Sequence, residues 1–135
     1  MKTIDEARNF FKQDLYATKT TGIHIDEVSK GYAKCSFSIE DRHKNAADSV
    51  MGGAIFTLAD FTFAVAANFD QPLTVTLSSS INFISVAKGS ILIAEARCIK
   101  ETRSTTFFEI KVTDDLNQLV ATISSTGFKK APIKS

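Results

Sequence analysis

"MGGAIFTLADFTFAVAANFD", residues 51–70, is the stretch that decides the fold. It reads as a helix that is apolar on every side, and such a helix has to be covered on all sides. It opens with two glycines and carries one carboxylate, Asp60, in its middle. A charge in an apolar core is destabilising unless it is paired or neutralised. Either a partner group offsets that cost, or Asp60 has a function.

The rest of the chain predicts a sheet that covers this helix. Around the 50–68 helix, hydrophobic periodicity predicts a helix over 4–16 and strands over 22–29, 32–40, 73–86, 90–100, 105–114 and 119–128. Residues 41–49 read as a loop, from which Asp48 or Ser49 can cap the helix. In the 73–86 strand, alternation places Val75, Leu77, Ser79, Ile81 and Phe83 on one face. The fold class is therefore α+β, with one antiparallel sheet curled around the helix and a partner subunit over the rest.

Composition narrows the class of protein. The 135 residues suit one domain, 1–135, in which 129–135 reads as a loose tail. Hydrophobic residues make up 44% and charged residues 23%, which argues against disorder, and the net charge of +1 favours neither nucleic acid nor a membrane. The N-terminus has no signal-peptide pattern, so we expect a soluble, cytoplasmic protein. Cys35 and Cys98 have no ligand spacing and read as reduced thiols, so we expect no metal site.

The glycines and Asp60 suggest a catalytic arrangement. Gly52 and Gly53 stand in the first helical turn, where free N–H groups and the helix dipole can stabilise an oxyanion. Simpler explanations exist for both features. The glycines can serve close helix packing, and Asp60 can pair structurally with a backbone N–H or with a lysine. Asp60 lies about 12 Å along the axis from Gly52, too far for both to act on one carbonyl. A site that uses both needs two antiparallel helices, one from each subunit.

"HKNAADSVMGGAIFTLADFTFAVAAN", residues 43–68, resembles the signature of the hotdog-fold acyl-CoA thioesterases, in particular the phenylacetate-degradation (PaaI-like) type. That family shows an Asn, then His-Gly-Gly, then an apolar helix with one Asp. The resemblance implies a sheet wrapped around the helix, in dimers that often pair into tetramers. It implies that the Gly52 N–H polarises the thioester carbonyl, that Asp60 of the facing subunit is the nucleophile or general base, and that Asn45 orients the water or the carbonyl.

The chain also departs from the family pattern. Met51 replaces the family's His, and Val86 replaces a Pro. The turn "KETRSTT", residues 100–106, resembles a family turn in which an Arg meets the nucleotide of coenzyme A. The resemblance therefore implies coenzyme A or substrate contacts from a set of residues on the turn and at the helix start: Lys100, Arg103, Ser104, Met51 and Gly53. Lys88, Lys129 and Lys130 are further basic candidates, although each also reads as a solvated surface charge.

We therefore expect a homo-oligomeric acyl-CoA thioesterase that hydrolyses a small aryl or a short or medium acyl-CoA to a carboxylic acid and free CoA. No cofactor is expected beyond the coenzyme A of the substrate. One alternative is a protein of the same fold that binds acyl-CoA without hydrolysing it, which Met51 favours. A hotdog dehydratase is a second alternative, but that class uses a His near the central helix, and the helix here has none. His43 reads as a packed or exposed loop residue, or as a substitute base.

Overall fold

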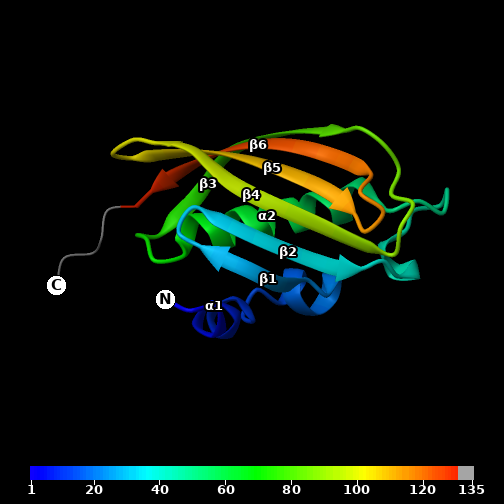
Figure 1. Cartoon of the computed structure of the whole chain (residues 1–135), viewed down its shortest axis with the longest axis horizontal. Helices are drawn as coiled ribbons and strands as arrows, with labels where there is room; N and C mark the ends of the chain where they lie inside the picture. Colours follow the sequence, from blue (N-terminus) through cyan, green and yellow to red (C-terminus); the bar gives the residue numbers. More distant parts are fainter. Residues whose placement is uncertain (131–135) are drawn as a thin grey trace.

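The computed structural model describes residues 1–130, and a long helix lies in the curve of a six-stranded antiparallel sheet (Figure 1). The helix is α2, Gly52–Asn68, and it contacts every strand. The strands are β1 His24–Ser29, β2 Tyr32–Ser38, β3 Thr74–Phe83, β4 Ile91–Glu101, β5 Thr105–Asp114 and β6 Leu119–Lys129. Their order across the sheet is β1-β2-β4-β5-β6-β3, so β1 and β3 form the two edges. The predicted α+β arrangement is confirmed.

The core lies between the inner face of the sheet and α2. Along β2, Ala33, Cys35 and Phe37 are buried and alternate with less buried neighbours, because successive side chains of a strand point to opposite faces. Cys35 therefore points into the core. From α2, Leu58 and Phe63 are fully buried against the strands. Burial of this apolar surface is the main stabilising contribution to the fold.

The prediction that five alternate residues of β3 share one face is wrong. The register between β3 and β6 shifts between Thr76 and Ser78, which marks a bulge at Leu77. An extra residue reverses the alternation, so Ser79 and Ile81 share a face with Thr76 rather than with Leu77. Leu77 is exposed, whereas the Ser79 hydroxyl lies 2.8 Å from that of buried Ser125. Because of the bulge, Thr76 lies on the same face of β3 as Ser79 and Ile81, the face toward α2, although its side chain remains exposed.

The N-terminal segment is less regular than the single helix predicted over 4–16. Helix α1 spans Ile4–Phe11, and a short π-helix, Tyr16–Thr21, follows it and ends at Gly22. Gly22 has φ +83°, a left-handed conformation that glycine adopts readily and that terminates a helix. The start predicted for the next strand, residue 22, is therefore two residues early.

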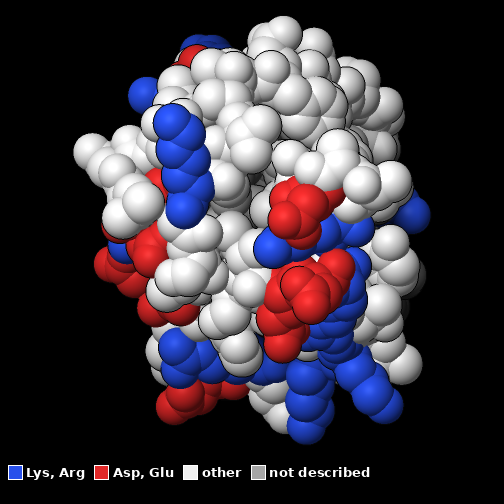
Figure 2. All heavy atoms as spheres, turned by 90° about the vertical axis from the view of Figure 1, so that its right-hand side faces the viewer, with Lys and Arg blue, Asp and Glu red and all other residues white. Residues whose placement is uncertain are grey.

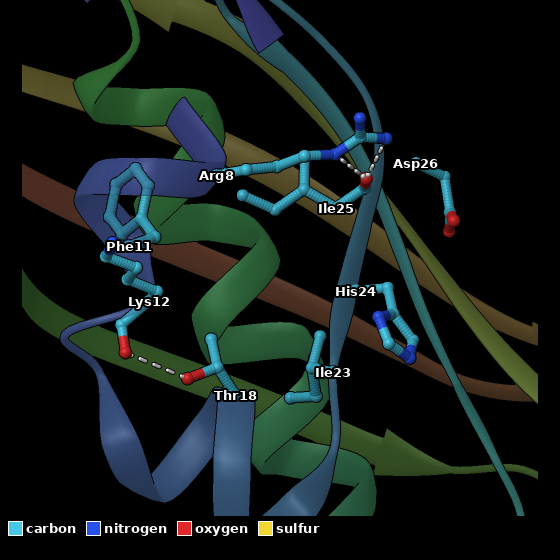
Figure 3. A pocket seen from close by; sticks show the side chains of 8 residues that line it. All are labelled: Arg8, Phe11, Lys12, Thr18, Ile23, His24, Ile25 and Asp26. Carbon is cyan, nitrogen blue, oxygen red and sulfur yellow. Dashed lines mark hydrogen bonds between the residues drawn. The ribbon is translucent and has the colours of Figure 1, made fainter. Parts of the chain in front are cut away.

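Helix α1 is fixed between β1 and α2. The Phe11 ring packs edge-on against the Phe61 ring of α2, with 5.7 Å between centroids. Nε and Nη2 of Arg8 donate hydrogen bonds of 3.0 and 2.8 Å to the carbonyl oxygen of Ile25, which Figure 3 shows beside the hollow between α1 and β1. In the same view the Thr18 hydroxyl donates to the carbonyl oxygen of Lys12.

Two further expectations are corrected at the ends of elements. The N-cap of α2 is Met51 and makes no side-chain capping hydrogen bond, so the cap predicted from Asp48 or Ser49 is wrong. The tail predicted from residue 129 is partly ordered, because Lys129 closes β6 and the Lys130 N–H donates to the Leu73 carbonyl at 2.8 Å. Residues 131–135 of that tail lie outside the described residues. Within residues 1–130, no helix is long and apolar enough to cross a membrane.

Candidate active site

One stripe of α2 is not covered by the sheet. Gly53 and Asp60 are exposed, and Thr57 and Ala64 are partly exposed, at spacings of three to four residues that place them on one side of the helix. In the single chain Asp60 is therefore open to solvent, on the side of the helix that a partner subunit is expected to cover. The sheet covers most of the helix and stops short of the side that carries the carboxylate.

Asp60 lies in a pocket of about 430 Å³ between α2 and the segment that follows α1. The other lining residues are Asp14, Leu15, Tyr16, Ala17, Phe56, Thr57, Phe61 and Ala64. Desolvation raises the pKa of Asp60, the negative charge of Asp14 raises it further, and the Thr76 side chain of β3 lowers it by hydrogen bonding. The first cause of the raised pKa is the apolar crowding on one side of an otherwise open carboxylate.

The start of α2 lines a different pocket, of about 520 Å³. It is lined by Asn45, Ser49, Val50, Gly52, Ile55, Phe83, Ile84, Ser85, Val86 and Ala87. A Cβ on Gly52 would lie 3.1 Å from Cζ of Phe83, so the glycine lets that ring approach the helix closely, whereas a Cβ on Gly53 would meet little. No acceptor within residues 1–130 bonds the N–H of Gly52 or Gly53. Both donors remain available at the positive end of the helix.

Asn45 organises the loop in front of this pocket. Its Oδ1 accepts hydrogen bonds from the N–H groups of Ala47 and Ser49, at 2.9 and 3.2 Å. Its Nδ2 donates to no acceptor within residues 1–130, so the amide can both hold the loop and offer a donor. Asp48 lies 3.6 Å from the Lys44 ammonium, which offsets the negative charge at this entrance.

His43 is a packed loop residue rather than a substitute base. It is buried, its Nδ1 accepts from the Glu40 N–H at 3.0 Å, and its Nε2 lies 2.8 Å from the Thr21 carbonyl. Both ring nitrogens are therefore occupied in holding the loop against the π-helix. Met51, where the family has His, is exposed and lies beside Gly53.

Most of the basic residues predicted to bind coenzyme A lie at the other end of the molecule from Gly52, whereas Lys88 lies in the loop that lines the Gly52 pocket. Lys100, Arg103 and Ser104 are exposed on or beside the β4–β5 turn, which Figure 1 places at the end where α2 finishes. The Lys129 N–H donates to the Ser104 carbonyl at 2.8 Å. At the Gly52 end, Figure 2 shows basic and acidic side chains intermixed below and a mostly uncharged surface above. One chain therefore does not bring these residues to the glycines.

Sequence reasoning missed a loop clamp next to the Gly52 pocket. Burial acts to raise the pKa of the Asp114 carboxyl, but the N–H groups of Gln118, Lys88, Gly89 and Leu116 hold it below its usual value. The donors on Lys88 and Gly89 lie 2.8 and 3.0 Å from Oδ2. The clamp therefore fixes the loop between β3 and β4 that lines the pocket. Residues 114–118, "DDLNQ", have the composition of a turn, but nothing in the sequence pairs them with residues 87–90, "AKGS".

Asp14 and Thr76 were also missed as neighbours of Asp60. Asp14 follows α1 in an irregular segment, and Thr76 lies on the face toward α2 only because of the bulge, so neither position follows from periodicity. No group of three or more His, Cys, Asp or Glu side chains within residues 1–130 is arranged to hold a metal ion.

Comparison with known proteins identifies the family. Residues 48–121, more than half of the chain, match the family described as "Thioesterase superfamily". A protein of Archaeoglobus fulgidus named "Putative esterase" is 34% identical over 106 residues, which cover 78% of this chain and 69% of that protein. The acyl-coenzyme A thioesterase PaaI of Escherichia coli is 27% identical over 121 residues, which cover 89% of this chain and 86% of that protein.

Solved structures agree with the sequence matches. The structure of the E. coli PaaI protein superposes with a TM-score of 0.83, covering 96% of this chain and 97% of that one, at 22% identity. A Streptococcus mutans protein solved with bound acetyl-CoA superposes with a TM-score of 0.77, covering 83% of this chain and 91% of that one, at 29% identity. The chain belongs to the thioesterase superfamily, and the prediction of a hotdog-fold thioester hydrolase of PaaI-like type is confirmed.

Proposed function

We propose that the protein hydrolyses acyl-CoA thioesters, with a small aryl or a short or medium acyl group, to a carboxylic acid and free coenzyme A. The observation that carries the proposal is that α2 presents two kinds of functional group that thioester hydrolysis needs. The helix presents unbonded N–H groups in one pocket and a carboxylate with a raised pKa in another. The S. mutans relative that binds acetyl-CoA supports a coenzyme A ester as the substrate.

The active site lies between two copies of the chain. Two antiparallel α2 helices, packed along the stripe of Gly53, Thr57, Asp60 and Ala64, bring the Gly52 end of one chain to Asp60 of the other. The stripe is uncovered and consists of small side chains with one carboxylate, so a second helix can approach it closely. The same antiparallel arrangement brings the Arg103 end of one chain toward the Gly52 end of its partner. A homodimer is the minimal unit, and a dimer of dimers is compatible with it.

In the reaction, the thioester carbonyl oxygen accepts from the Gly52 N–H, and the Asn45 amide orients the water or the carbonyl. Asp60 either removes a proton from the attacking water or attacks the carbonyl carbon itself. In both routes the C–S bond breaks and the sulfur leaves as coenzyme A thiolate, which takes up a proton. In the second route water then hydrolyses the acyl–Asp60 anhydride, which releases the carboxylic acid and regenerates the Asp60 carboxylate. In both routes Asp60 has to be ionised at the start.

The test is hydrolysis of phenylacetyl-, benzoyl-, butyryl- and octanoyl-CoA, with a thiol reagent that reports free coenzyme A. The Asp60→Asn variant serves as the inactive form, and Asp5→Asn, which removes an exposed carboxylate on α1, serves as the matched control. We expect turnover in the wild type and the control and none in Asp60→Asn. Equal rates in all three proteins would contradict the proposed mechanism.

A non-hydrolysing acyl-CoA-binding protein remains the second candidate, and Met51 favours it. A methionine cannot make the hydrogen bonds that the family's imidazole makes at this position. This candidate predicts that acyl-CoA raises the melting temperature without turnover of any ester. In that case Met51→His is expected to restore turnover.

A further inference from the structure

The Asp60 pocket contains a second carboxylate that the proposed mechanism does not use. Asp14 lies in the short segment between α1 and the π-helix and lines the same 430 Å³ pocket as Asp60. Its backbone holds it in place, because its N–H donates to the Phe11 carbonyl at 2.9 Å and its carbonyl accepts from the Thr18 N–H at 2.9 Å. No hydrogen bond or ion pair within residues 1–130 uses its carboxylate, so that group is free to act on the pocket.

Few titratable groups face Asp60 in its pocket. From the segment after α1 comes Asp14, from the π-helix comes Tyr16, and from β3 comes the uncharged hydroxyl of Thr76. Neither a lysine nor an arginine is among the residues that line the pocket. Two carboxylates thus share a partly desolvated space without a cation between them, which disfavours the state in which both are ionised.

We propose that Asp14 is a positioning residue that acts through Asp60: its negative charge in the shared pocket sets the pH at which the site becomes active and disfavours acyl groups that carry a charge of their own. The proposal rests on the proposed function, since it takes Asp60 as the group that has to be ionised. It concerns a part of the chain, residues 12–16, that lies outside the family match.

The first consequence concerns pH. Burial and the charge of Asp14 both raise the pKa of Asp60, so the ionised, active form appears at higher pH than for an ordinary aspartate. Neutralising Asp14 removes one of these causes. The acid limb of the pH–rate profile then moves to lower pH, while the rate on the plateau, where Asp60 is ionised in both proteins, stays the same.

The second consequence concerns the substrate. The pocket walls beside Asp60 are apolar, with Leu15, Tyr16, Phe56 and Phe61, and they suit the acyl group of a thioester bound at Asp60. An acyl group that ends in a carboxylate would add a further negative charge to this space. Asp14 therefore selects neutral acyl groups over acidic ones, because its negative charge repels the charged end of an acidic acyl group.

The experiment compares Asp14→Asn, Asp14→Glu and the control Asp5→Asn in pH–rate profiles of kcat/KM. Asn keeps the backbone hydrogen bonds and the size of the side chain and removes only the charge. We expect the acid limb to move to lower pH in Asp14→Asn and to stay in Asp14→Glu and Asp5→Asn. A lower rate at every pH with an unmoved limb would show a merely structural role and overturn the proposal.

Acyl selectivity gives a second readout that a structural role would not change. Glutaryl-CoA and valeryl-CoA have the same chain length and differ by a terminal carboxylate. We expect Asp14→Asn to raise the ratio of their kcat/KM values toward the acidic ester, and Asp5→Asn to leave it unchanged. An unchanged ratio in Asp14→Asn would contradict the selectivity assigned to Asp14.

Failure of the proposed function remains distinguishable from failure of this inference. If no thioester is hydrolysed, or if Asp60→Asn keeps full activity, the proposed function is wrong. The titration of the Asp60 carboxyl carbon, followed by NMR in the wild type and in Asp14→Asn, then still decides whether the two carboxylates interact. A midpoint that does not fall in Asp14→Asn would overturn the inference independently of turnover.

Discussion

The two pockets along α2 differ in the chemistry that they offer. The pocket at the start of the helix is rich in backbone donors, has the Asn45 amide at its rim and contains no carboxylate among its lining residues. The pocket at Asp60 contains two carboxylates and no free backbone donor of the helix, because mid-helix N–H groups bond to the preceding turn. Each pocket lacks what the other supplies, which is why the proposed thioester hydrolysis combines the two pockets from different chains.

The largest expected effect comes from substitutions that inactivate one of the two pockets at a time. Asp60→Asn is expected to lower kcat by about 10²–10⁴-fold, the usual contribution of a general base. Gly52→Val is expected to block the pocket at the start of α2, since even a Cβ at this position would lie 3.1 Å from the Phe83 ring. When the two inactive proteins are unfolded together and refolded, mixed dimers regain one intact site and part of the activity. Continued inactivity of correctly assembled mixed dimers would show that each site lies within one chain.

Asp114→Asn tests the loop on the Gly52 side alone. It is expected to lower the free energy of unfolding by roughly 1–3 kcal/mol, because an amide cannot accept all the hydrogen bonds of a buried carboxylate. The folded-state pKa of Asp114 is lowered, so its contribution is present above the unfolded pKa of about 4 and is lost as the pH falls through the folded value. Urea unfolding from pH 7 down to pH 3 measures this. A wild-type advantage that does not shrink toward acid would contradict it.

Asn45→Asp tests whether the Asn45 amide donates a hydrogen bond in the reaction. The carboxylate keeps an acceptor for the Ala47 and Ser49 N–H groups, so the loop and the melting temperature are expected to stay unchanged. The donor on Nδ2 is lost, which is expected to lower kcat/KM by about three- to tenfold, the value of one hydrogen bond. Asn45→Ala, which also removes the loop acceptor, is the comparison. Equal activity of Asn45→Asp and wild type would limit Asn45 to holding the loop.

Thr76→Val gives the smallest effect and concerns the Asp60 side alone. Its hydroxyl lowers the pKa of Asp60, so its removal is expected to move the acid limb of the pH–rate profile to higher pH. Valine fits a strand and preserves the shape of threonine, so the fold should not change. The direction is opposite to that expected for Asp14→Asn. A movement in the same direction in both variants would mean that local structure, rather than charge, controls Asp60.

The sequence predicted the sheet and the central helix, because hydrophobic periodicity indicates both. It also predicted the separation of Gly52 from Asp60, because the rise per residue of a helix determines that distance. Sequence reasoning failed where one residue changes the register or where contacts link distant turns. The bulge at Leu77 places Thr76 on the face toward α2, and a run of alternating residues does not reveal an inserted one. The neighbourhood of Asp14 and Asp60 depends on how a π-helix packs on α2, which local propensity does not determine.

The bond from Arg8 to the Ile25 carbonyl bears on how far association can proceed. An unpaired strand at a sheet edge can template another strand, and a chain with two such edges can polymerise. The forked guanidinium occupies a carbonyl on β1, and α1 covers that edge, whereas β3 at the opposite edge has no such cover within residues 1–130. If copies of the chain pair edge to edge, β3 is the more open edge within residues 1–130, and pairing through that edge alone stops at two copies instead of growing into a fibre.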